Sequence, residues 1–149
     1  MTAPILKPSR WKVDLALLVL RVGIGMSFVF VYGWAKITGG MSTWVDLGGN
    51  MAIFGVAAWP AFWGFLAALT EFGGGILLML GLFFRPVLVL LLCVMTVAAA
   101  SHLAAGEGPW HATEMATVFL ALFLLGPGRY SLDNLLFGSP ETSSRPHDD

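Results

Sequence analysis

Four long apolar runs constrain the fold more than any other feature of this sequence. They cover roughly residues 13–32, 59–82, 86–105 and 110–125. A helix needs about 20 mostly apolar residues to cross the hydrocarbon core of a bilayer, and each run approaches this length, the fourth only barely. Hydrophobic residues make up 57% of the chain and charged residues only 11%, whereas a soluble domain carries about 25% charged residues. The sequence therefore predicts an all-α integral membrane protein that crosses the bilayer about four times.

The segments between the last three runs have the chemistry of tight turns. Residues 83–86 place Pro86 at the expected first position of the third helix, and residues 106–109 form a second turn rich in glycine. Such short connections make consecutive helices antiparallel neighbours, which predicts a four-helix antiparallel bundle. Residues 126–128 (Gly-Pro-Gly) should end the fourth helix, and Ser131 can cap a short interfacial segment that reaches residue 137.

The first loop, residues 35–58, combines glycines with large apolar side chains. It is too apolar for a free linker, so we expect one or two short helices that lie on or dip into one membrane face. The first apolar run follows basic residues but is too long for the hydrophobic region of a signal peptide, so we expect it to be retained. Residues 1–137 should form one transmembrane domain, and residues 138–149 a polar, disordered cytoplasmic tail.

The basic residues predict the orientation in the membrane. Counted with the N-terminus inside, the outer side holds only Lys36, and the inner side holds the other basic residues outside the apolar runs: Lys7, Arg10, Lys12, Arg85, Arg129 and Arg145. Because such residues favour the cytoplasmic side, both termini should face the cytoplasm and the long first loop the outside.

Ionisable residues within the apolar runs are the first candidates for function, since a charge at the bilayer centre costs about 3 kcal/mol. Arg21 lies roughly 14 Å from the inner face and Glu71 roughly 18 Å from the outer face, at 1.5 Å per helical residue. In a core about 30 Å thick these depths nearly coincide, which predicts an ion pair between Arg21 and Glu71. The pair could serve a ligand directly, or it could only fix the register of two helices.

A second polar group is expected at the outer end of the bundle. His102, near the end of the third helix, and Glu114, at the start of the fourth, are the candidate catalytic residues, with proton transfer as their role. Tyr32 and Lys36 leave the first helix at the same end and, with Arg21 and Glu71, are the candidate binding residues. His111 could share this pocket. The alternatives are a His102 side chain bonded to a backbone carbonyl, and solvated polar residues at a helix start.

Several other chemistries are disfavoured. Lys and Arg total eight and are scattered, so no basic patch for nucleic acid is present. Cys93 is the sole cysteine, and a dithiol redox centre needs two. No metal site is predicted, because the spacing His111-x-x-Glu114 occurs once and a dinuclear carboxylate site needs it twice. Haem between His102 and His111 is a weaker alternative, because both side chains also fit a proton-handling pocket.

Several motifs resemble those of the DoxX family of small bacterial four-helix membrane proteins. The matching stretches are residues 20–23 (LRVG), 33–36 (GWAK), 70–74 (TEFGG), 81–85 (GLFFR) and 126–133 (GPGRYSLD), the last being the most specific. His102 and Glu114 fit the polar positions of helices three and four. The resemblance covers nearly everything from the first helix to residue 133 and excludes the tail.

The resemblance implies a multi-pass protein of the bacterial inner membrane, linked to redox chemistry. The family takes its name from a subunit of an archaeal thiosulfate:quinone oxidoreductase, so one hypothesis is a quinone-linked oxidoreductase or a subunit of one. Quinone would then be the ligand, with a redox partner protein or a second copy of the chain as partner within the lipid bilayer. The alternative hypothesis is a non-enzymatic membrane partner, an assembly factor or a small-molecule-binding protein.

Overall fold

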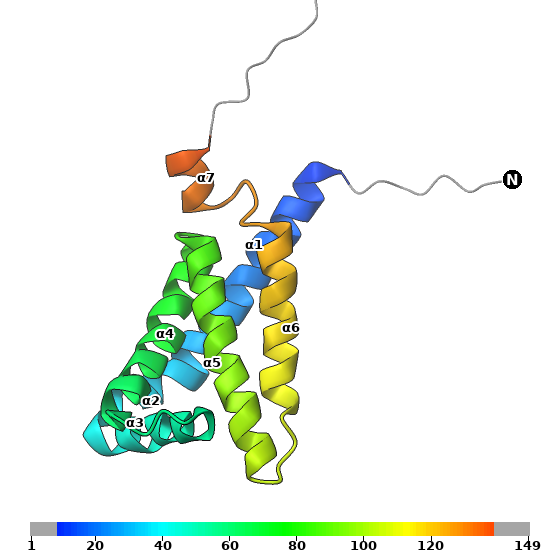
Figure 1. Cartoon of the computed structure of the whole chain (residues 1–149). Helices are drawn as coiled ribbons and strands as arrows, with labels where there is room; N and C mark the ends of the chain where they lie inside the picture. The colour runs from blue at the N-terminus through cyan, green and yellow to red at the C-terminus, as the bar shows by residue number, and fades with distance from the viewer. Residues whose placement is uncertain (1–8, 139–149) are drawn as a thin grey trace, which may run out of the picture.

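A computed structural model of the chain describes residues 9–138 (Figure 1). The described residues form helices and turns without any strand, which confirms the all-α prediction. The predicted tail lies outside this range, apart from Gly138. The helices follow one another as α1 (Arg10–Met26), the π-helix η1 (Ser27–Gly33), α2 (Trp34–Thr38), α3 (Gly40–Gly49), the 3₁₀-helix η2 (Asn50–Phe54), α4 (Pro60–Leu80), α5 (Phe84–Ala104), α6 (Trp110–Leu125) and α7 (Leu132–Phe137).

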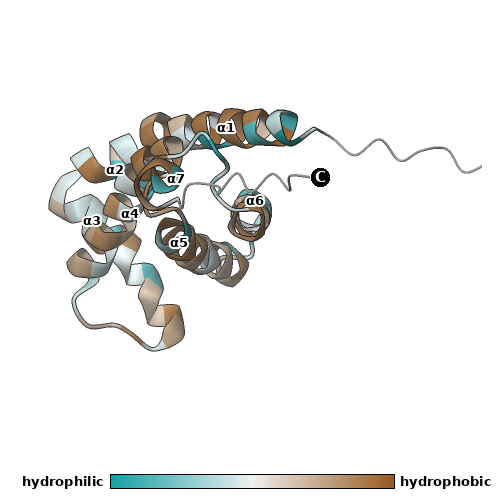
Figure 2. Ribbon diagram, turned by 90° about the horizontal axis from the view of Figure 1, so that it is seen from above, coloured by the Kyte–Doolittle hydropathy of each residue, from teal (hydrophilic) through white to brown (hydrophobic). Residues whose placement is uncertain are grey.

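The long helices form a bundle with an apolar exterior. α5 packs between α4 and α6, and α1 crosses obliquely and packs on α4 (Figure 1). Three stretches are long and apolar enough to cross a membrane, Arg10–Thr38, Pro60–Leu80 and Phe84–Ala104, and α6 is a shorter apolar helix. Hydrophobic residues predominate along the long helices (Figure 2), and many of their large apolar side chains are exposed. Leu124, for example, is 74% exposed. Such a surface suits lipid, so the predicted membrane bundle is confirmed.

The first membrane helix is longer than the sequence predicts. α1, η1 and α2 continue one another from Arg10 to Thr38, where the prediction ended the helix near residue 32. Gly33 lies within this continuous helix and does not end it. Its role is a close contact with α4. A Cβ atom there would collide with the backbone of Phe72 on α4. The π-helical turn lies at this crossing, and the extended helix carries Lys36 to the same end of the bundle as α3.

The first loop folds into α3 and η2, as predicted for short helices in this segment. α3 lies across one end of the bundle (Figure 1) and packs closely on α4. Two glycines make this possible. A Cβ atom on Gly48 would collide with the backbone of Pro60, and one on Gly64 with the backbone of Trp44. The indole of Trp44 also donates a 3.0 Å hydrogen bond to the carbonyl of Lys36. α3 is thereby fixed against both α2 and α4.

The opposite end of the bundle is closed by α7. Ser131 caps α7, as predicted, and accepts a hydrogen bond from the backbone N–H of Asn134. The carboxylate of Asp133 accepts the N–H groups of Phe83 and Phe84, each at 2.9 Å. These groups begin α5, which starts at Phe84. The prediction that Pro86 is the first residue of this helix is therefore wrong. An acidic cap from another helix thus moved the helix start by two residues.

The core between the helices is aromatic and aliphatic. Phe28 from η1 and Phe119 from α6 pack edge to face, with ring centroids 5.1 Å apart. Both rings are almost completely buried. Buried aliphatic side chains of α4, α5 and α6 surround them: Leu78, Leu88, Leu91, Met95 and Leu122. This core occupies the middle of the bundle and the α7 end. The candidate functional site lies at the α3 end.

Candidate functional site

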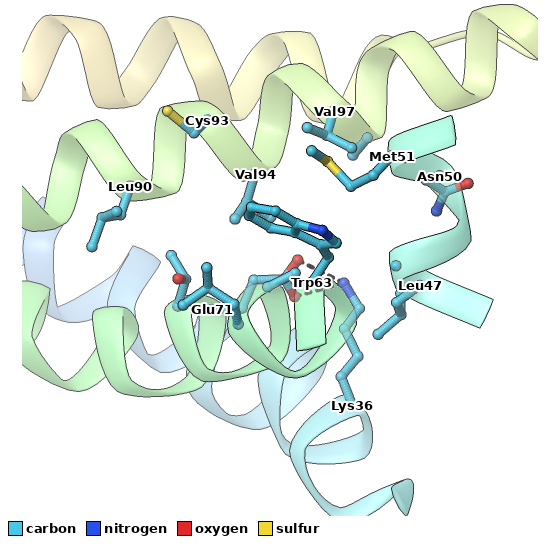
Figure 3. A pocket seen from close by; sticks show the side chains of 15 residues that line it. Lys36, Leu47, Asn50, Met51, Trp63, Glu71, Leu90, Cys93, Val94 and Val97 are labelled. Carbon is cyan, nitrogen blue, oxygen red and sulfur yellow. Dashed lines mark hydrogen bonds and ion pairs between the residues drawn. The ribbon is translucent and has the colours of Figure 1, made fainter. Parts of the chain in front are cut away.

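A partly buried ion pair joins α2 to α4 near the α3 end of the bundle. The Lys36 ammonium lies 2.7 Å from Oε1 and 2.6 Å from Oε2 of Glu71, and donates to both (Figure 3). The Glu71 side chain is only 3% exposed, and the Lys36 side chain is 31% exposed. A carboxylate this deep in an apolar bundle needs a partner, and Lys36 is that partner. The structure therefore brings two of the predicted binding residues together.

Small residues allow the helices around Glu71 to approach one another. A Cβ atom on Gly75 would lie 3.0 Å from the carbonyl oxygen of Gly25 on α1. A Cβ atom on Gly74 would lie 3.5 Å from the side chains of Val87 and Leu91 on α5. One glycine thus serves the α1 contact and the other the α5 contact.

A cavity of about 220 Å³ opens beside the ion pair. Its walls come from α2, α3, η2, α4 and α5, and most of the lining is apolar. The polar side chains on the wall are those of Lys36, Glu71, Asn50 and Thr70. Figure 3 shows Lys36 reaching in from α2, with Asn50 and Met51 on η2 and Val94 on α5. We call this space the Lys36–Glu71 cavity; its lining residues are Lys36, Leu47, Gly48, Asn50, Met51, Trp63, Leu66, Ala67, Thr70, Glu71, Leu90, Cys93, Val94, Val97 and Ala98.

The wall residues outside the ion pair were not predicted. Trp63 is the largest of them, and its indole N–H donates a 3.2 Å hydrogen bond to the carbonyl of Ala58, which helps to orient the ring. The residues one and two turns before Glu71 on α4 are Ala67 and Gly64. Both residues are small. The contribution of η2 could not be predicted, because its position depends on the contact of α3 with α4.

Arg21 lies at the α7 end of the bundle, away from Glu71. Its side chain is completely buried, and Nη2 donates a hydrogen bond to the carbonyl of Tyr130. The guanidinium carbon lies 6.0 Å from the centre of the Phe84 ring. Nε and Nη1 have no hydrogen-bond partner among residues 9–138. A Cβ atom on Gly81 would collide with Nη1, so the guanidinium is tightly enclosed. The predicted ion pair between Arg21 and Glu71 is wrong.

The error has a geometric cause. Arg21 and Lys36 are fifteen residues apart on one continuous helix, which separates their Cα atoms by roughly 22 Å along its axis. Helical side chains lean toward the N-terminus. Arg21 therefore leans toward the α7 end, and Lys36 leans from the end of the helix back into the bundle. The prediction compared only the Cα depths of Arg21 and Glu71, and these depths leave out the direction and length of the side chains.

The predicted outer pocket is divided in the structure. The Nδ1 atom of His102 lies 2.8 Å from a carboxylate oxygen of Glu107 in the turn after α5, and both side chains are exposed. Tyr32 stacks on His111, with ring centroids 4.7 Å apart. These two rings line a separate hollow of about 170 Å³ between the first membrane helix and α6, which does not include His102, Lys36 or Glu114. Glu114 is exposed on α6. Of the groups predicted to share one pocket, Tyr32 and His111 do lie together, whereas His102, Lys36 and Glu114 lie apart from them.

Three comparisons with known proteins bear on this site. A family model described as DoxX matches residues 16–104. The inner membrane protein YqjF of Escherichia coli strain K12 is 34% identical over 130 residues, which cover 83% of this chain and 93% of that protein. No solved structure matches the chain at a significant level. All residues that line the Lys36–Glu71 cavity fall within the family match, whereas His111, Glu114 and Tyr130 lie outside it.

Proposed function

The chain belongs to the DoxX family, and from that premise we propose that it binds the ring of a quinone in the Lys36–Glu71 cavity, as a subunit of a quinone-linked oxidoreductase of the bacterial inner membrane. One observation carries the proposal: a mostly apolar cavity inside a membrane bundle has an ammonium–carboxylate pair on its wall, with the carboxylate buried and the ammonium partly exposed. A quinone ring has the matching chemistry, with a flat apolar body and carbonyl oxygens that accept hydrogen bonds.

The size of the cavity favours a single ring. Pockets for drug-sized ligands measure about 300–1,000 Å³, whereas the Lys36–Glu71 cavity measures about 220 Å³. The indole of Trp63 offers a flat aromatic wall on which a ring can stack. Cavity and wall therefore suit a ring-sized headgroup better than a larger cofactor.

The ion pair has capacity for one further partner. An ammonium group has three donors, and in this structure Lys36 directs hydrogen bonds to the two oxygens of Glu71. The remaining N–H can donate to a quinone carbonyl. Reduction of a quinone to a quinol takes up two electrons and two protons. Glu71 and Lys36 can hold and transfer the protons, and a partner protein would deliver the electrons.

His102 keeps a proposed role at the edge of this site. It lies one helical turn beyond Ala98, which lines the cavity, and its ring is hydrogen-bonded to Glu107 at the exposed end of α5. A histidine at this place can exchange protons with water. We assign it the exchange of protons between solvent and the site, without contact to the quinone. Glu114 has no comparable position at the cavity.

The test is a binding measurement on the purified full chain. Lipid extracts of protein in mild detergent should contain quinone by mass spectrometry, and titration with a short-chain benzoquinone should quench tryptophan fluorescence with saturation. Lys36→Gln should weaken the fitted affinity at least about tenfold, since one lost charged hydrogen bond is worth about 1.5–3 kcal/mol. Ser27→Ala, in the separate Tyr32–His111 hollow, is the matched control and should bind normally. Absence of quinone together with unsaturable quenching would refute the proposal.

A second function has one observation in its favour. Both oxygens of Glu71 already have hydrogen bonds from Lys36, as in a purely structural link between α2 and α4. The chain would then be a non-enzymatic membrane partner or assembly factor. In that case the double replacement Lys36→Met/Glu71→Leu should preserve the cellular phenotype of the parent, because an apolar pair can replace a structural ion pair. Loss of the phenotype in a stably folded double variant would exclude this alternative.

A further inference from the structure

A second apolar hollow adjoins the Lys36–Glu71 cavity between η2 and α5. It measures about 360 Å³, and we call it the η2–α5 groove. Met51, Cys93 and Val97 line both spaces. The side chains that line the groove alone are those of Phe54, Val89, Leu92 and Thr96. Phe54, Val89, Cys93 and Thr96 are exposed on the outside of the bundle, where lipid lies. The groove therefore adjoins the wall of the cavity on one side and the bilayer on the other.

This connection distinguishes the groove from other apolar hollows on the surface. Two further hollows lie along α1, one of them reaching Leu125 on α6. Neither shares a lining residue with the Lys36–Glu71 cavity. They have the character of ordinary spaces between lipid-facing side chains. The η2–α5 groove shares three residues with the cavity, and one of these, Met51, has a flexible side chain that can move aside.

Polarity changes along the joined spaces. Lys36 and Glu71 supply the charged groups of the cavity, and the groove has only the hydroxyl of Thr96 as a polar side-chain group other than the thiol of Cys93. The Thr96 hydroxyl already donates a 2.8 Å hydrogen bond to the carbonyl of Leu92. A ligand that fills both spaces therefore has a polar ring at one end and a long apolar chain at the other.

We infer that the η2–α5 groove holds the apolar tail of a long-chain quinone whose ring lies in the Lys36–Glu71 cavity, and that the quinone enters sideways from the bilayer between η2 and α5. This inference rests on the proposed function for the identity of the ring and adds the path of the tail. The cavity alone is too small for a ring with a long chain. The tail must leave through a wall, and the wall made by Met51, Cys93 and Val97 is the one that the cavity shares with the groove.

The first test blocks the groove without touching the cavity. Thr96→Trp fills the groove from a residue that does not line the cavity. It should weaken binding of a decyl-substituted benzoquinone at least about tenfold and leave binding of the tailless benzoquinone within about twofold. Leu124→Trp, on the lipid-facing side of α6, is the control and should change neither affinity. Equal binding of the tailed quinone by Thr96→Trp and the parent, with normal binding of the tailless one, would overturn the tail path and leave the proposed function intact.

The second test needs no substitution, so it decides the question even if Thr96→Trp fails to fold. A benzoquinone with a photoreactive diazirine midway along its alkyl tail is bound to the full chain in mild detergent and irradiated. Mass spectrometry should place the crosslink on η2 or α5 within the groove, and an excess of tailless quinone should suppress it. Suppressible crosslinks to α1 or α6 would refute the path. If neither quinone binds the parent, the proposed function itself fails.

Discussion

Replacement of Lys36 by Met should destabilise the protein more than replacement of Glu71 by Gln, because the two partners of the ion pair are unequally buried. The Glu71 side chain is 3% exposed and the Lys36 side chain 31% exposed. Lys36→Met leaves a carboxylate without a partner among apolar side chains, a change that costs about 3–5 kcal/mol.

The reverse change should be milder for two reasons. Glu71→Gln keeps a carbonyl oxygen that can accept a hydrogen bond from Lys36. The partly exposed ammonium of Lys36 can also move its charge toward the interface while its carbon chain stays in apolar surroundings. We expect a loss of about 1.5 kcal/mol, the scale of one weakened hydrogen bond. The double variant Lys36→Met/Glu71→Leu should lose less stability than the single variants Lys36→Met and Glu71→Leu lose together. The coupling energy should be at least about 1 kcal/mol.

The assay is equilibrium unfolding in mixed detergent, followed by circular dichroism, on all members of the cycle. A parallel cycle with Arg21→Leu and Glu71→Leu is the control. Because Arg21 lies at the opposite end of the bundle, its change should add to that of Glu71 within about 0.5 kcal/mol. Strict additivity in the Lys36 cycle, or strong coupling in the Arg21 cycle, would refute the geometry of the site.

Three further predictions concern the frame around the site. Gly64→Ala should destabilise the protein by about 1–3 kcal/mol in thermal unfolding, since its Cβ would collide with the backbone of α3; Gly73→Ala, on the same helix with only a 3.8 Å side-chain neighbour, should be neutral or stabilising. Asp133→Ala should cost about 1–2 kcal/mol through loss of the α5 cap, and a Tm equal to that of the parent would contradict this role. In a version without the native cysteine, a cysteine at position 43 (Thr43) should react with an impermeant thiol reagent from the periplasm and one at position 144 (Ser144) should not; the opposite pattern would reverse the proposed orientation.

The sequence predicted the elements that depend on composition along the chain. Long apolar runs give the membrane helices, and glycine or proline turns give their ends, because both signals act within one segment. The short helices of the first loop and the Ser131 cap were predictable for the same reason. Pairing between segments was harder. The sequence singled out Glu71 and Lys36 separately, but assigned Glu71 the wrong partner because Lys36 was placed outside the membrane.

The lining of the cavity shows where prediction from one sequence ends. Met51 and Asn50 reach the site only because α3 lies against α4, and that contact depends on the missing side chains of Gly48 and Gly64. A glycine can serve several structural purposes, and the sequence alone does not show which backbone segment it will contact. The residues that carry the ion pair were therefore candidates from the start, and the residues that shape the cavity became visible only in three dimensions.

The two ends of the bundle have different physical designs, and this separation makes the functional proposal testable. At the α7 end, Arg21, Ser131 and Asp133 bond to backbone groups of other segments or of their own turn, and Arg21 is fully enclosed. At the α3 end, Lys36 and Glu71 bond to each other beside an open cavity. Side chains that form hydrogen bonds with backbone groups stabilise the fold whether or not a ligand is bound. A side-chain pair on a cavity wall can exchange one of its hydrogen bonds for a ligand without unfolding a helix. Changes at the α7 end should therefore lower stability and leave quinone affinity per folded molecule unchanged, whereas conservative changes at Lys36 should reduce affinity in protein that remains folded.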